Sequence, residues 1–89
     1  FEFKTDKYVH GIVMSLVDYY FSALDIEING GKVKVNNYAN IEDDHLGRTT
    51  AIFKGYITPF KTTESIKVTI RTELNSNQLD NFKIHLLID

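Results

Sequence analysis

Hydrophobic residues in the first quarter of the chain recur at steps of three and four residues. The stripe consists of Val9, Ile12, Val13, Leu16, Val17, Tyr20 and Leu24. Such spacing is typical of one face of an amphipathic helix. Thr5 and Asp6 are residue types that cap helix N-termini, and residues 1–4 alternate as a short strand would. Gly11 costs about 1 kcal/mol in a helix interior, so we expect it to contact a strand closely. The pattern predicts a strand and then a helix over residues 7–24.

After residue 25 the hydrophobic period changes from 3.6 to 2. Asn29 and Gly30 lie between two short alternating runs, and Asn-Gly is a strong hairpin signal. Residues 36–47 contain many polar side chains and are interpreted as an exposed connection. Further strands are predicted over 49–60, 66–74 and 82–88, with turns at 61–64 and 75–77.

Together these elements predict an α+β fold for a single domain over residues 1–89. One N-terminal amphipathic helix would pack on a four- to five-stranded antiparallel meander sheet, in the order β-α-β-β-β-β. This order of elements resembles the outline of cystatin-like and nuclear-transport-factor-2-like folds. The chain has no Gln-x-Val-x-Gly hairpin of a cystatin-type inhibitor, so the resemblance concerns the outline alone and identifies no family.

Composition narrows the class of protein without naming a function. Eighty-nine residues can hold one hydrophobic core, and the 43% hydrophobic content is that of a folding chain. The absence of cysteine excludes disulfides and thiolate chemistry, and leaves the compartment undetermined. The longest apolar stretch is too short and too polar to span a bilayer. Because the first residue is Phe1 and not Met, we expect a trimmed or processed piece of a larger protein.

Strand parity predicts which side chains face away from the core. If the apolar set faces the helix, its neighbours form the opposite face. The apolar set is Val33, Val35, Phe53, Ile57, Ile66, Val68, Ile70, Phe82, Ile84 and Leu86. The opposite face would carry Lys32, Lys34, Lys54, Tyr56, Lys67, Arg71, Lys83 and His85, with Glu27 and Glu73 as its acidic members.

Six of the ten lysines and arginines would thus share one face of a chain whose net charge is −2. The candidate site for an anionic partner is Lys32, Lys34, Lys54, Tyr56, Lys67, Arg71 and Lys83. Such a surface suits phosphate backbones, stacked bases or an acidic protein. Lysine is also an ordinary solvent-side residue that protects sheet edges, and this alternative stays open.

The predicted helix carries more aromatic area than one small sheet face covers. Tyr8, Tyr19 and Phe21 are therefore candidates for a partner interface, with core packing as the alternative.

No catalytic or metal-binding pattern survives inspection. Residues 42–45, Glu-Asp-Asp-His, are consecutive, so they cannot all converge on one ion, and they are interpreted as a solvated acidic connection. His10, His45 and His85 are far apart in the sequence, and no phosphate-binding glycine motif is present.

The sequence favours a non-enzymatic protein-binding or assembly module, either part of a larger complex or a homodimer, without cofactor or metal. The alternative is a nucleic-acid-binding module that uses the basic face of the sheet.

Overall fold

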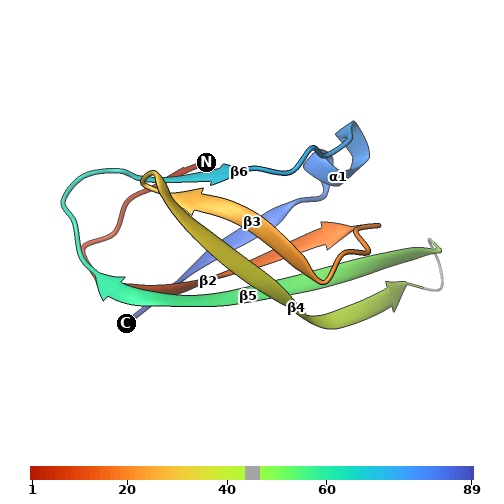
Figure 1. Ribbon diagram of the computed structural model, residues 1–89, viewed down its shortest axis with the longest axis horizontal. Coiled ribbons are helices and arrows are strands. Elements are labelled where there is room, and N and C mark those ends of the chain that lie inside the picture. The colour runs from red at the N-terminus through yellow and green to blue at the C-terminus, as the bar shows by residue number, and fades with distance from the viewer. Residues whose placement is uncertain (44–46) are drawn as a thin grey trace.

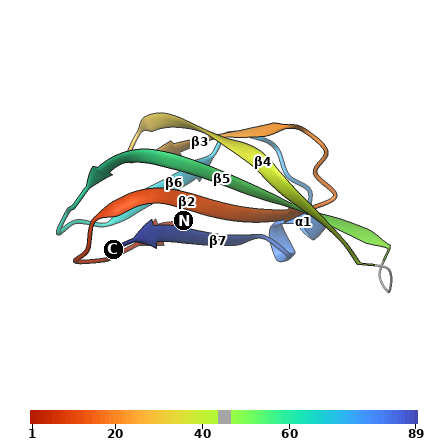
Figure 2. The ribbon, with the colours of Figure 1, turned by 90° about the horizontal axis from the view of Figure 1, so that it is seen from below.

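The computed structural model describes residues 1–43 and 47–89, and these form one antiparallel sheet with a single short helix (Figure 1). The strands are β1 (Glu2–Phe3), β2 (Val9–Val17), β3 (Ala23–Ile28), β4 (Gly31–Asp43), β5 (Arg48–Phe60), β6 (Ile66–Ile70) and β7 (Lys83–Ile88). Helix α1 (Ser76–Asp80) lies between β6 and β7. The strand order is β1-β6-β3-β4-β5-β2-β7, and the sheet curls into a half-barrel (Figure 2).

The predicted helix over residues 7–24, and with it the α+β cystatin-like or nuclear-transport-factor-2-like outline, is wrong. Residues 9–17 are strand β2, which pairs with β5 on one side and β7 on the other. Ile12, Met14 and Leu16 are fully buried, whereas Val13 and Ser15 are half-buried. A central strand with apolar residues on both of its faces has a nearly continuous apolar sequence. Such a sequence also contains apolar residues three and four positions apart, which is the spacing of a helix. Long-range pairing with β5 and β7 therefore decides the state of this segment.

The glycine inside this strand has the close contact that its position suggested. A Cβ at Gly11 would lie 2.7 Å from the Gly55 carbonyl oxygen and 2.8 Å from Leu87 Cδ1. A register shift between Val9 and Gly11 brings the backbones of β2 and β5 together here. Gly11 thus serves strand pairing and not helix packing.

The hairpin prediction is confirmed. Asn29 and Gly30 both have positive φ, 50° and 84°, as a two-residue hairpin turn requires. The exposed connection predicted over 36–47 is wrong over its first part, because β4 continues to Asp43 after a register shift between Asn37 and Ala39. Strands β4 and β5 form a long hairpin arm that extends past β3 (Figure 1).

The predicted parity of the later strands is confirmed, although the helix that was to cover them is absent. Val35, Phe53, Ile66 and Val68 are buried in the core. The other six members of the predicted apolar set pack against that core: Val33, Ile57, Ile70, Phe82, Ile84 and Leu86. Curling of the sheet allows its inner face to cover itself, and β2 supplies the apolar side chains expected from a helix.

The turn predicted over 75–77 begins helix α1 instead. The Asn75 side chain accepts a hydrogen bond from the Gln78 backbone N–H at 2.9 Å, and the Gln78 side chain accepts one from the Asn75 N–H at 3.0 Å. This reciprocal cap is readable in the sequence as Asn-x-x-Gln. The same Gln78 side chain is buried and donates to the carbonyl of Asp18 at 3.1 Å. Helix α1 is thereby fixed against the end of β2.

Candidate functional site

The outer face of the sheet, meaning the strand side chains directed away from the core, contains the predicted lysines. Most of them lie opposite an acidic residue of a neighbouring strand. Lys32 lies opposite Glu27, Lys34 lies opposite Asp25, and Lys67 lies opposite Glu2. Opposite charges at facing cross-strand positions stabilise a sheet modestly.

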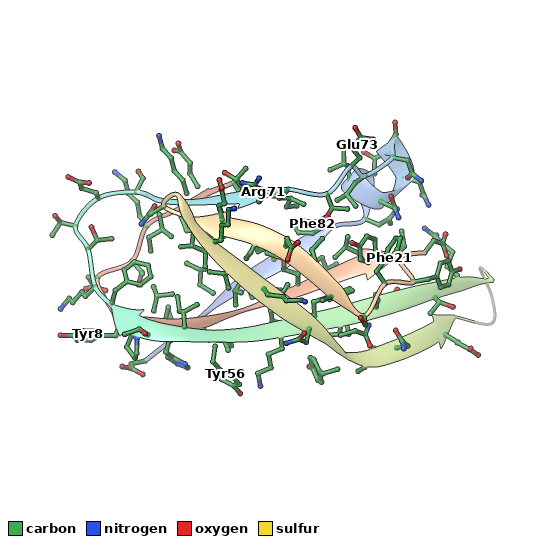
Figure 3. All side chains as sticks on the ribbon, viewed as in Figure 1. Tyr8, Phe21, Tyr56, Arg71, Glu73 and Phe82 are labelled. Carbon is green, nitrogen blue, oxygen red and sulfur yellow. The ribbon has the colours of Figure 1, made fainter. Side chains whose placement is uncertain are left out.

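Arg71 and Glu73 lie just beyond strand β6 and differ in surroundings (Figure 3). The Arg71 guanidinium donates to the Glu27 carboxylate in an ion pair. Glu73 is exposed close to α1, so it does not belong to the sheet face on which it was predicted. Four of the six predicted cations therefore have an acidic residue beside them, Arg71 in an ion pair and three lysines at facing strand positions, and this part of the outer face is mixed in charge.

The other half of the outer face holds Lys54 between two aromatic rings. Lys54 Nζ lies 5.0 Å from the ring centroid of Tyr56 and 5.8 Å from that of Tyr38. Tyr56 and Tyr38 are 70% and 62% exposed. The pKa of Lys54 is raised above its usual value. The main cause is its hydrogen bond to the Tyr56 side chain, and the second is electrostatic attraction to the same side chain. Tyr38 was missed because its segment was interpreted as a connection, although an aromatic residue among polar ones was a usable signal.

Lys83 and His85 lie on β7, across β2 from this cluster of Lys54, Tyr38 and Tyr56. Their strand partners across β2 are Ser15 and Val13, neither of which is acidic. Lys54 is itself opposite Val13 on the other side of β2. Lys83 is therefore separated from Lys54 by strand β2, whereas Lys34 lies on the strand next to Lys54, two residues from its partner Asn36.

The predicted aromatic interface of Tyr8, Tyr19 and Phe21 does not assemble. Tyr19 is 7% exposed and packs edge-to-face on Phe53, with 5.4 Å between ring centroids. Tyr8 and Phe21 are exposed but lie at opposite ends of the molecule (Figure 3). Core packing, the alternative stated for these residues, applies to Tyr19 alone.

Strand β7 forms an open edge of the sheet. In the described chain it pairs with β2 and with no strand on its other side. The N–H of Asp89 donates to the Tyr8 carbonyl at 3.2 Å. Backbone groups alternate sides along a strand, so Ile84, Leu86 and Ile88 direct theirs away from β2. A row of strand donors and acceptors therefore faces the gap between β7 and the opposite edge, β1.

Aromatic side chains bridge this gap at one point. Phe1 precedes β1 and Phe82 precedes β7, and their rings stack with centroids 5.1 Å apart. No backbone pairing joins β1 to β7 among the residues of known placement. At this point the two edges of the half-barrel touch through these rings. Among the described residues, the backbone groups of the two edges are not hydrogen-bonded to each other.

The acidic connection falls partly outside the described residues, since Asp44 and His45 are not among them.

Comparison with protein-family models, with curated proteins and with solved structures finds no match to this chain. Within residues 1–43 and 47–89 no helix has the length and apolar character needed to cross a membrane. The geometry of the site therefore carries the functional argument alone.

Proposed function

We propose that this chain is a protein-binding and assembly module that accepts an extended segment of a protein partner along the open edge of β7. The observation that carries the proposal is the one-sided pairing of β7. Unpaired strand edges bind other strands readily, and strand addition is a common mode of peptide recognition. Ile88, at the end of this edge, is 43% exposed and would gain cover from such a partner.

Strand directions support a partner that runs antiparallel to β7. All six neighbouring pairs in the sheet are antiparallel, so β1 and β7 run in the same direction. A single added strand antiparallel to β7 is antiparallel to β1 as well. It would be an eighth strand, and an eight-stranded antiparallel sheet can close into a barrel without an edge.

The side chains of β7 define the partner that fits. Ile84 and Leu86 face the core, so the partner strand needs apolar residues on that face. On the outer side of β7, Lys83 lies at one end and Asp89 at the other. A partner strand would therefore fit best with an acidic residue opposite Lys83 and a basic residue opposite Asp89. A second copy of residues 83–89, placed antiparallel to β7, meets these requirements. Its Asp89 would lie opposite Lys83 of the protein, and its Lys83 opposite Asp89.

The test uses a synthetic peptide of residues 83–89 with blocked ends. Its matched control has the same composition with its end charges exchanged, Lys83→Asp and Asp89→Lys. We expect the first peptide to slow amide exchange at Ile84, Leu86 and Ile88, measured by NMR. The control should bind several-fold more weakly, since like charges then face each other.

Exchanging the same two charges in the protein should reverse this preference, so that the control peptide binds better. Unchanged amide exchange with the peptide in millimolar excess would refute the proposal. Equal binding of the two peptides would refute the assigned register and the partner pattern drawn from it.

A second candidate function, binding of single-stranded nucleic acid, is favoured by Lys54 between the exposed rings of Tyr38 and Tyr56. Exposed aromatic faces stack bases, and the lysine would meet the phosphate backbone. We expect an oligothymidine to bind at low salt and dissociate as salt rises, and Lys54→Glu to abolish binding. Lys67→Glu is the control, since Lys67 is already opposite Glu2. Absence of a mobility shift at low salt would refute this candidate.

A further inference from the structure

The loop between β2 and β3, residues 18–22, is firmly anchored at both ends. The Asp18 N–H donates to the Thr49 carbonyl at 2.8 Å, and the Asn37 N–H donates to the Ser22 carbonyl at 2.8 Å. Gln78 adds a side-chain bond to the Asp18 carbonyl. Asp18 itself has a positive φ of 51°, a backbone conformation that is uncommon outside glycine and recurs at functional sites.

This anchored loop presents two aromatic side chains to solvent. Tyr20 is 79% exposed and Phe21 is 70% exposed, whereas Tyr19 between β2 and these two is buried. The ring of Phe21 rests against that of Tyr19 with centroids 5.4 Å apart, which limits its motion. Folding gains little from two exposed rings, so their display on a fixed loop needs another explanation.

A groove of about 390 Å³ lies between this loop and the β4–β5 arm. We call it the aromatic groove. Its volume falls in the range of roughly 300–1,000 Å³ that is usual for ligand sites. The residues that line it are Tyr19, Tyr20, Phe21, Ser22, Asn37, Asn40, Glu42 and Thr49. The aromatic groove thus combines rings with amides, hydroxyls and one carboxylate.

Two of the polar side chains of the aromatic groove, those of Asn37 and Asn40, are hydrogen-bonded to each other. The Asn37 amide nitrogen donates to the Asn40 side-chain oxygen at 3.0 Å. This bond fixes both amides while leaving the Asn40 amide N–H₂ and a lone pair of each oxygen able to bind a ligand. Among residues 1–43 and 47–89, those that line the groove include no Lys, Arg or His, the cationic groups that usually recognise phosphate and carboxylate ligands.

We propose that the aromatic groove binds a neutral oligosaccharide. A sugar ring has a face of C–H groups, which carries partial positive charge and packs on the negative face of an aromatic ring. Its edge carries hydroxyls that donate to carboxylate and amide oxygens and accept from amide N–H groups. Tyr20 and Phe21 supply the faces, and Asn37, Asn40 and Glu42 supply the polar partners.

The experiment titrates the protein with maltotetraose, cellotetraose and chitotetraose while amide shifts are followed by NMR. At least one probe should shift residues 18–22 and 37–42 at millimolar concentration. Tyr20→Ala and Phe21→Ala should each weaken that binding about tenfold, as removal of a central aromatic contact does. Tyr8→Ala removes an exposed tyrosine from the opposite end of the molecule and should leave binding unchanged.

Three results would overturn the proposal. The first is absence of shifts with all three sugars, and the second is binding that Tyr20→Ala and Phe21→Ala leave unaltered. The third is a response at the same residues to tetramethylammonium but to none of the sugars, which would identify a cation site formed by the rings and Glu42.

Discussion

Substitution of Gly11 by alanine discriminates directly between the strand found here and the helix that hydrophobic spacing predicts. The new Cβ would stand 2.7 Å from the Gly55 carbonyl oxygen and 2.8 Å from Leu87 Cδ1. The Leu87 methyl can turn away, but the Gly55 carbonyl belongs to the backbone of β5 and moves only with that strand. In a helix, by contrast, alanine would be the more favourable residue by about 1 kcal/mol.

Two opposing effects set the size of the change. Overpacking of a core usually costs about 1–3 kcal/mol, and replacing glycine by alanine in an extended strand recovers about 0.5–1 kcal/mol. The midpoints of these ranges differ by roughly 1.3 kcal/mol, and we expect Gly11→Ala to lower the free energy of unfolding by about that amount. In a chain of this size each kcal/mol corresponds to roughly 4–8 °C in Tm.

The assay is urea denaturation followed by tyrosine fluorescence, with a lower midpoint and an unchanged slope expected. Gly31→Ala is the matched control: its nearest contact, the Ile28 carbonyl oxygen at 3.4 Å, is ordinary, and its φ is not positive. The control should unfold at the parent midpoint or slightly above it. A midpoint for Gly11→Ala equal to or higher than that of the parent would refute the strand pairing argued for β2.

Three further perturbations address the core, the helix anchor and the outer face. Phe53→Ala removes the largest fully buried side chain and should cost about 3–5 kcal/mol in the free energy of unfolding, measured by urea denaturation. Gln78→Leu should cost about 1–3 kcal/mol by leaving the half-buried Asp18 carbonyl without its side-chain donor, and should speed amide exchange at Asp18; unchanged exchange there would contradict the anchoring role. Tyr56→Phe should lower the pKa of Lys54 in an NMR titration, because the Tyr56 hydroxyl is the main cause of its elevation. The stabilisation from this contact is present below pH 10.5 and is lost as pH rises through the raised pKa of Lys54, so an unshifted titration would refute it.

Local sequence patterns correctly predicted the later strands and one turn. The alternation around Val68 and Ile84 placed the right side chains inward, and Asn29-Gly30 placed the first hairpin. The candidate basic face was predictable only as a set of outward side chains. Asp25 and Glu2 lie opposite two of its lysines on other strands, and sequence parity does not show which strands are neighbours.

The chain by itself determined which side chains point together, because alternation is a property of each strand alone. Tertiary structure decided what those side chains meet. Residues 9–17 are a strand because β5 and β7 flank them, and the open edge of β7 exists because the seven-stranded sheet ends there. Both outcomes depend on hydrogen bonds between segments distant in sequence, which no local pattern contains.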